Sequence, residues 1–266
     1  MIYLESRCEM RNIQVGILQE PSNADKMSTF LARMTQRGHN LSTLDDVMNL
    51  FNKPVKNEEL RMQLAGLNHG TIKRFDSYTV VVVGASRRFL AQIRTHQHAD
   101  FVSGSLQYSD WSEIKNKSDW EKMFVVPYEI LDNSSLIDYY LRKCGSAFMA
   151  YETIASQASN DAAGFIMPNG LRNVLVIQAN VQQWQYMIKL RACRRNSEET
   201  RYVLLKIWDA LLGTDGGKDF FSPEILGFDC QFGGCKEGKF CCGHPFEKGL
   251  TPKQILQADF SLCMEA

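Results

Sequence analysis

The chain has 266 residues, of which 44% are hydrophobic and 11% aromatic, and its 30 basic and 30 acidic side chains give a formal net charge of zero. This composition is typical of a globular protein and excludes long disorder. Because a neutral balance lacks the excess cations that displace counterions from a nucleic-acid backbone, no general DNA or RNA binding is expected. Neither a signal peptide nor an apolar run of the ~20 residues that span a membrane is visible, so we expect a cytoplasmic protein.

The first quarter of the chain predicts three helices. Apolar residues recur at helical spacing after Pro21 and predict a helix over about 24–37. A second helix is expected over 43–51, with Ser42 or Thr43 as its N-terminal cap, and a third over about 57–67.

The pattern then changes to that of a buried strand. Residues 78–83 form an unbroken, mostly β-branched run, and Gly84 is expected to end the strand. A helix is expected from Ser86. In that helix Gln92 and His96, four residues apart, would lie on one polar face.

The second half of the chain is mainly helical by its pattern. Residues 174–177 fit either a short strand or the start of a helix, because periodicity does not decide between them. From Gly227 to Gly249 the chain is rich in Gly and Cys and is expected to be irregular. We therefore divide the chain into one domain at 1–226 and a C-terminal tail at 227–266. The helices expected in this half cover about 136–143, 147–157, 178–195 and 197–212.

Half of the eight cysteines lie close together in the tail. They offer enough soft ligands for a tetrahedral zinc ion, although their spacing matches no standard zinc ribbon or finger. The alternative is free or disulfide-paired thiols. The four residues are Cys230, Cys235, Cys241 and Cys242.

The most specific motif lies over 95–109. His96 and Ser105 have the spacing of an Arg-His-Arg-x7-Ser signature that commonly ends Ser-x-Arg-Tyr, and Tyr108 closes it. Two flanking arginines and the arginine before the tyrosine are replaced by Thr95, Gln97 and Gln107. The segment resembles a degenerate form of the signature of the flavin-dependent thymidylate synthases.

The resemblance extends in order and spacing over roughly residues 14–215, which a chance match of one short motif would not produce. Residues 68–71 resemble the family's flavin-contacting His-x-Ser/Thr element, and residues 78–92 resemble its strand, Gly-x-Ser-Arg turn and Gln-bearing helix. Residues 180–201 resemble its long helix with Asn, Leu-Arg and Glu-x-Arg.

This resemblance implies a fold and an assembly. The fold class is α+β, with an antiparallel sheet flanked by long helices. The expected assembly is a homotetramer whose sites combine residues from different subunits. The tryptophan-rich stretch and the helix over about 178–195 are expected to supply the apolar interface.

The resemblance also implies the chemistry. In this family a flavin relays a methylene group from methylenetetrahydrofolate to carbon 5 of dUMP, and NADPH supplies the electrons. The protein stacks the nucleotide on FAD and polarises the uracil ring. By resemblance, FAD is contacted by His69, Thr71, His96 and Asn180. The nucleotide is contacted by Gln92, Ser105, Gln107 and Arg191, with catalytic roles for Ser105 and Arg191.

The departures from the family pattern mainly remove cations. Thr95, Gln97, Gln107 and Gly164 stand where arginines are expected, and Arg74 and Ser103 stand where glutamates are expected. At about 1.5–3 kcal/mol per charge-assisted hydrogen bond, these losses weaken binding of the usual nucleotide unless other groups replace them. Nearby candidates are Arg87, Arg88, Arg94, Arg194 and Arg195.

Two alternatives follow from these losses. One is an enzyme of the same fold whose pyrimidine substrate lacks a free monophosphate. The other is a non-catalytic paralogue that serves as a binding module.

Overall fold

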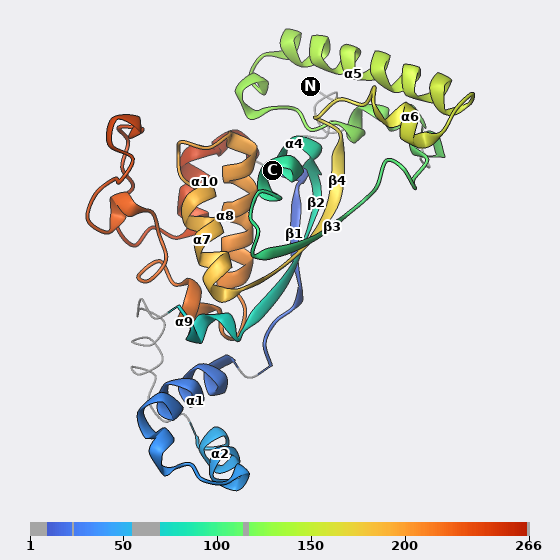
Figure 1. Ribbon diagram of the computed structural model, residues 1–266. Helices are drawn as coiled ribbons and strands as arrows, with labels where there is room; N and C mark the ends of the chain where they lie inside the picture. The colour runs from blue at the N-terminus through green and yellow to red at the C-terminus, as the bar shows by residue number, and fades with distance from the viewer. Residues whose placement is uncertain (1–9, 23, 55–69, 114–116, 265–266) are drawn as a thin grey trace.

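The computed structural model describes residues 10–22, 24–54, 70–113 and 117–264. Its centre is an antiparallel sheet with the strand order β1-β2-β4-β3 (Figure 1). The strands are β1 (Gln14–Gln19), β2 (Ser77–Ser86), β3 (Ala99–Ser103) and β4 (Arg172–Asn180). The expected α+β class with an antiparallel sheet is confirmed.

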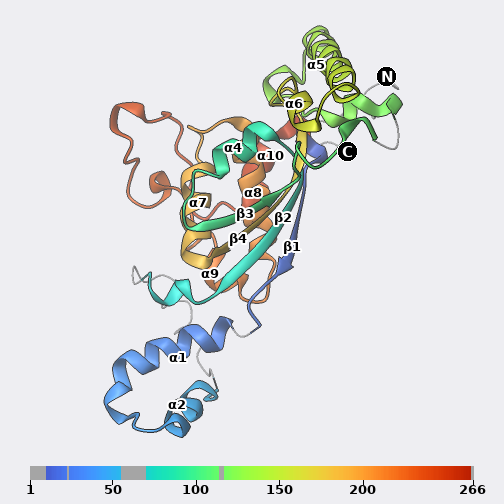
Figure 2. The same cartoon turned by 45° about the vertical axis from the view of Figure 1, so that its right-hand side comes forward.

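The helices form distinct groups around this sheet (Figures 1 and 2). Helices α7 and α8 cover one face, and α10 lies against α8. Helices α1 and α2 extend beyond one end of the sheet, and α5 with α6 lies at the other end. Their bounds are α1 (Ala24–Arg37), α2 (Leu44–Phe51), α4 (Arg87–Ile93), α5 (Ser134–Ala155), α6 (Asn160–Gly164), α7 (Val181–Arg191), α8 (Glu198–Leu212), α9 (Gly217–Phe221) and α10 (Pro252–Asp259).

The main core lies between the sheet and α7, α8 and α10. Alternate residues of the central strands, such as Val80 and Ile177, are fully buried and belong to the same cluster as Trp184 and Trp208. Trp184 is completely buried, and the large apolar side chains that this helix leaves exposed are Tyr186 and Leu190, at 54% and 37%. The segment after residue 226 contributes to this same core through Phe228, Phe246, Ile255, Leu256 and Phe260.

The opposite face of the sheet remains open in the single chain. Val83, Val102 and Val174 are 39%, 71% and 47% exposed on strands β2, β3 and β4. Because adjacent strand residues point to opposite faces, these apolar side chains alternate with the buried ones. The sheet therefore presents apolar surface on both sides.

Glycine positions explain two differences from the sequence predictions. Gly84 does not end β2, because it adopts φ +88° at a bulge and the strand continues to Ser86. The two helices expected near 136–143 and 147–157 are one continuous helix, α5. Residue 145 within this helix is a glycine, and a Cβ at this position would come within 2.7 Å of the Trp120 indole.

The other predicted elements have mixed outcomes. Helices α1, α2 and α8 confirm the predictions for 24–37, 43–51 and 197–212, and Thr43 caps α2 through a capping box with Asp46. The helix expected over 57–67 lies outside the described residues. Residues 174–177 are strand, as part of β4.

The helix expected over 178–195 is shorter at both ends. Strand β4 continues to Asn180, whose Oδ1 accepts the Gln183 N–H at 2.9 Å and so starts α7. The helix ends at Arg191. Within the described ranges, no helix has the length and apolar character that crossing a membrane requires.

Candidate functional site

The candidate site lies where α4, the turn after it, and the C-terminal end of α7 approach α8. Ser86 caps α4 by accepting the Phe89 N–H at 3.1 Å. Its own N–H and Oγ donate to the Glu199 carboxylate at 2.6 and 2.5 Å. Burial raises the pKa of the Glu199 carboxyl, although the Ser86 hydrogen bonds oppose the shift. This contact fixes α4 on α8.

Gln92 is held in one orientation by α8. Its Oε1 accepts the Ser197 hydroxyl at 2.8 Å and is also bonded to the Thr200 hydroxyl. The amide nitrogen has no acceptor among the described residues, so its two N–H groups remain able to donate. These N–H groups can donate to a carbonyl oxygen of a ligand.

His96 does not share a helical face with Gln92. Helix α4 ends at Ile93, and His96 lies in the following turn, where its N–H donates to the Ile93 carbonyl at 3.2 Å. The expected i, i+4 arrangement is therefore wrong. The cause is the short distance along the chain to β3, which begins at Ala99 and leaves no room for another helical turn.

Tertiary folding brings His96 and Arg191 together from positions 95 residues apart. Arg191 Nε donates to His96 Nε2 at 2.9 Å, and Arg191 Nη2 donates to Thr95 Oγ1 at 2.8 Å. The Tyr186 ring meets the imidazole edge to face, with 5.7 Å between centroids. Thr95, which replaces a signature arginine, is thus a direct partner of Arg191.

This contact affects the charge state of His96. Burial, followed by the charge of Arg191, lowers the pKa of His96 to about 4. The imidazole is therefore neutral at pH 7, and because Nε2 accepts from Arg191, its proton lies on Nδ1. No acidic residue in the described part of the chain pairs with Arg191, so no carboxylate competes with an anionic ligand for this half-buried guanidinium.

Ser105 lies in the loop after β3 and shapes it. Its Oγ accepts the N–H groups of Gln107 and Tyr108 at 3.1 and 3.4 Å. This is common turn chemistry, and it leaves the hydroxyl proton available to another acceptor. Gln107 is exposed and lies beside Ser105 in the same turn.

Arginines gather at this end of the sheet. Arg94 Nη2 donates to Ser103 Oγ at 2.7 Å, two residues before Ser105. Burial, followed by the charge of Arg94, lowers the pKa of Arg87. Arg172, which sequence reasoning missed, lies opposite Ser86 in the register of β2 and β4.

Thr71 and Asn180 lie at the other end of α7. Thr71 is exposed before a 3-10 turn that is held on α7 by Arg74 Nε, which donates to Gln182 Oε1 at 2.7 Å. Asn180 caps the helix whose last residue is Arg191, about 16 Å away along the axis at 1.5 Å per residue. His69 lies outside the described residues.

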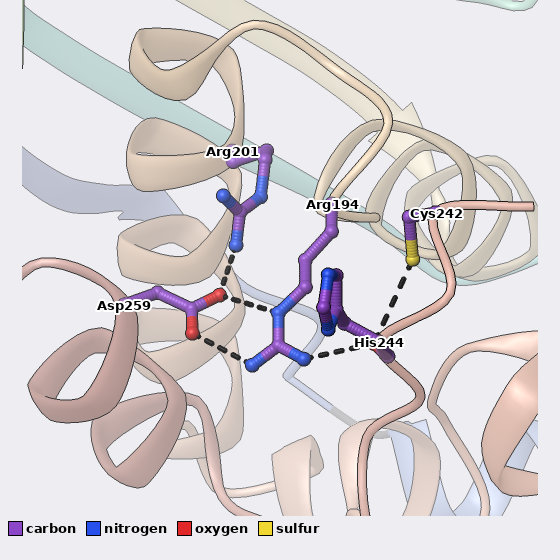
Figure 3. Close-up of polar contacts among 5 residues, drawn as sticks. All are labelled: Arg194, Arg201, Cys242, His244 and Asp259. Atoms are coloured by element: carbon purple, nitrogen blue, oxygen red, sulfur yellow. Dashed lines mark hydrogen bonds and ion pairs between the residues drawn. The ribbon is translucent and has the colours of Figure 1, made fainter. Parts of the chain in front are cut away.

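Arg194 and Arg195 both contact the C-terminal tail, and Figure 3 shows the contacts of Arg194. Arg194 donates to both carboxylate oxygens of Asp259 at 3.1 and 2.8 Å and to the His244 carbonyl at 2.8 Å. Arg195 donates to the Phe240 carbonyl at 2.7 Å. These contacts argue against either residue as a replacement for a lost nucleotide-binding arginine.

The geometry does not support the zinc interpretation of the tail. Within the described residues, no group of three or more His, Cys, Asp or Glu side chains is arranged to hold a metal ion. The tail instead lies against the end of α7 around a cavity of about 740 Å³. Four thiols of the tail line this cavity without forming such a group; they are Cys230, Cys235, Cys241 and Cys242.

Comparison with known proteins agrees with this architecture. The sequence profile of the family described as thymidylate synthase complementing protein matches residues 17–213. The flavin-dependent thymidylate synthase of Thermococcus onnurineus is 27% identical over 180 residues, which cover 66% of this chain and 71% of the relative. That of Pyrococcus furiosus is 24% identical over 177 residues, with the same shares of the two chains.

Solved structures share the fold at lower identity. The thymidylate synthase X of Helicobacter pylori with FAD and dUMP has a TM-score of 0.58 and 17% identity, over 79% of this chain and 96% of that one. The UMP/dUMP methylase PolB of Streptomyces cacaoi, bound with 5-Br dUMP, has a TM-score of 0.60 and 16% identity, over 79% and 94%. The profile match covers most of this chain, and the chain therefore belongs to the family of the flavin-dependent thymidylate synthases.

Proposed function

We propose that this protein is a flavin-dependent enzyme that transfers a one-carbon unit from methylenetetrahydrofolate to carbon 5 of dUMP or a related uracil nucleotide, with NADPH as the reductant. The observation that carries the proposal is the contact between Arg191 and His96, which joins two signature elements of the family into one site. FAD and dUMP in the Helicobacter pylori relative are consistent with it.

The residues present fit a flavin and a nucleotide. A neutral His96 with its proton on Nδ1 offers a donor and no competing charge, and Thr71 and Asn180 place hydroxyl and amide groups at the start of α7. Bound FAD supplies the redox and one-carbon relay chemistry that protein side chains lack. The roles of Thr71, His96 and Asn180 are to bind and orient that group.

The cluster of arginines supports a nucleotide that carries a phosphate. Arg191 has neutral partners, and Arg87, Arg94 and Arg172 form no ion pair within the described residues. Because the charge of Arg94 acts unfavourably on the Arg87 guanidinium, an anion that contacts these groups is favourable. We propose that Arg87 and Arg94 compensate for the missing signature arginines, which favours a nucleotide over a substrate without a monophosphate.

The remaining groups would act on the uracil ring and position the nucleotide. Gln92, fixed by Ser197 and Thr200, would donate its amide N–H to a ring carbonyl. The Ser105 hydroxyl and the exposed Gln107 amide lie in the loop beside Arg94. In this proposal Ser105 and Arg191 hold the reacting nucleotide, and Gln92 polarises its base.

We also propose a homotetramer in which sites form between subunits. Asn180 and Arg191 lie at opposite ends of α7, so a second chain would complete the surroundings of each half-site. The open sheet face, with exposed Val83, Val102 and Val174, offers the apolar surface that such an interface needs. A strict monomer at micromolar concentration in light scattering would contradict this assembly.

Spectroscopy and turnover of the full-length protein test the proposed function. We expect a flavin absorption spectrum as purified or after reconstitution with FAD, and NADPH oxidation stimulated by dUMP or UMP more than by uridine. Product analysis should show a methylated uracil nucleotide only when methylenetetrahydrofolate is present. A protein that binds no flavin after reconstitution contradicts the proposal, and stimulation by uridine alone would favour the substrate without a phosphate.

A further inference from the structure

Two consecutive cations beside the start of α7 have no carboxylate partner within the described residues. Lys73 and Arg74 belong to the 3-10 helix Ile72–Arg74, which lies shortly before β2. Lys73 is only 9% exposed, and Arg74 is on the surface. Neither side chain takes part in an ion pair in the described part of the chain. Because burying an unpaired ammonium group costs free energy, such a group is a candidate for binding an anionic ligand.

Neutral partners hold both side chains on one face of α7. Lys73 Nζ donates to Gln185 Oε1 at 3.1 Å, and Arg74 Nε donates to Gln182 Oε1 at 2.7 Å. Because Gln182 and Gln185 are three residues apart on a helix, they are neighbours on its surface and bring the two cations together. Gly70 lies against the same face, since a Cβ at this position would clash with the Gln182 amide.

Most of the donors on the two cations remain unused. Lys73 has three N–H groups but one acceptor among the described residues, and no acceptor there contacts the Nη groups of Arg74. Gln185 is fixed in turn, because its Nε2 donates to the Phe220 carbonyl at 2.7 Å. Burial lowers the pKa of Lys73, as expected for an ammonium group without an anion beside it.

The backbone at the start of α7 contributes less to an anion site than these side chains do. The Val181 N–H donates to the Asp76 carbonyl at 2.9 Å. The Gln183 N–H donates to Asn180 Oδ1 at 2.9 Å. Because these two N–H groups are already satisfied, an anion here would be held mainly by the ammonium and guanidinium groups.

We propose that Lys73 and Arg74 bind the diphosphate group of FAD. This inference rests on the proposed function, in which Thr71 and Asn180 contact FAD at the same end of α7. The diphosphate carries about two negative charges, which one ammonium and one guanidinium group can neutralise through charge-assisted hydrogen bonds. The chain thus has two cations beside the flavin, and one of them, Arg74, stands where the family pattern has a glutamate.

Flavin titration of the full-length apoprotein tests the site. Lys73→Met and Arg74→Gln should each weaken FAD binding at least about tenfold, but should change binding of riboflavin, which lacks the diphosphate, by less than about twofold. Arg74→Lys keeps the charge and should retain FAD affinity within about threefold. Arg74→Glu restores the residue of the family pattern and should weaken FAD binding most, because it places an anion beside the diphosphate.

Lys206→Met is the matched control for loss of a partly buried lysine. Lys206 also donates to a neutral acceptor, the Ile13 carbonyl, and burial also lowers its pKa. It belongs to α8 and contacts the residue before β1. The FAD affinity of this variant should equal that of the wild type, which separates loss of the phosphate contact from a general effect of removing a lysine.

Three outcomes would overturn the inference while the wild type still binds flavin, and these leave the proposed function intact. One is unchanged FAD affinity in Lys73→Met and Arg74→Gln. Another is an equal loss of FAD and riboflavin affinity in these variants, which would assign the two side chains to the fold of the turn. The third is FAD affinity of Arg74→Glu at or above that of the wild type. A wild type that binds no flavin would instead overturn the proposed function together with this inference.

Discussion

Arg191 and Arg194 are three residues apart, yet their surroundings differ in charge. Arg191 contacts a neutral imidazole and a hydroxyl, and no carboxylate in the described chain pairs with it. Arg194 shares the Asp259 carboxylate with Arg201, and their side chains are 26%, 11% and 9% exposed. A guanidinium neutralised in this way stabilises the fold, whereas one with neutral partners is available to a ligand. Two arginines that are three residues apart in the sequence can therefore have different roles.

The largest expected effect is on stability and concerns Asp259, the carboxylate that pairs with Arg194. Asp259→Ala leaves Arg194 and Arg201 buried without their anion, so the free energy of unfolding should fall by about 3–5 kcal/mol in chemical denaturation. The control is Asp209→Ala, which removes an exposed pair with Lys253 and should cost at most about 1 kcal/mol. Equal losses in the two variants would contradict the assignment of Arg194 to the fold.

The same carboxylate gives a defined pH window. Burial alone would raise the pKa of Asp259, but hydrogen bonding from Arg194 and the charge of Arg201 hold it below the ordinary value of 3.8. Its stabilising effect is therefore complete above about pH 4 and is lost as the pH falls through the lower folded-state pKa. The change Asp259→Ala should reduce the dependence of the free energy of unfolding on pH in that acidic range only.

The next effect concerns His96, the neutral partner of Arg191. Its pKa falls from 6.5 to about 4 on folding, so the unfolded chain binds a proton that the folded chain does not. The free energy of unfolding should therefore decrease as the pH falls from about 6.5 to about 4, by at most about 3 kcal/mol. Chemical denaturation at several pH values should show this slope in wild type and in His98→Gln. A slope that persists in His96→Gln would contradict a neutral His96.

Nucleotide affinity tests directly whether Arg191, which pairs with no carboxylate in the described chain, binds an anion. Arg191→Ala should weaken dUMP binding to the FAD-loaded protein at least about a hundredfold, and Arg191→Lys about tenfold, because Lys keeps the charge but loses the planar fork. Flavin binding should be largely retained. Arg195→Ala is the control, since its guanidinium contacts the tail. Full dUMP affinity of Arg191→Ala in calorimetry would place the anion elsewhere.

The smallest effect is expected at the other arginines of the sheet end. Arg87→Ala or Arg94→Ala should each weaken dUMP binding by about three- to tenfold, with a reduced dependence on salt, because one of several cations is lost. Uridine binding should not change. A similar loss for uridine would indicate that these residues support the loop around Ser105 and do not bind phosphate.

Local patterns in the sequence predicted much of the secondary structure. The capping residue Thr43 and the β-branched run over 78–83 each act over a few residues, so their effect on secondary structure can be predicted without knowledge of the fold. The family resemblance also named His96 and Arg191 as candidate site residues, and the structure brings the two into contact. The secondary-structure elements were predictable because the interactions that decide them lie within one turn or one strand.

Tertiary structure decided what these residues do. Only folding placed His96 beside Arg191 and beyond the end of α4, and only it separated Arg194 and Arg195 from the site by giving them the tail as partner. A glycine occurs within α5 at residue 145 because the indole of Trp120, from another segment, leaves no space for a Cβ there. Charge states, partners and close contacts depend on groups distant in sequence, and periodicity carries no information about them. The sequence thus determined the elements and the residue types available, and the long-range packing determined which of those residues contact one another and which are paired with a carboxylate.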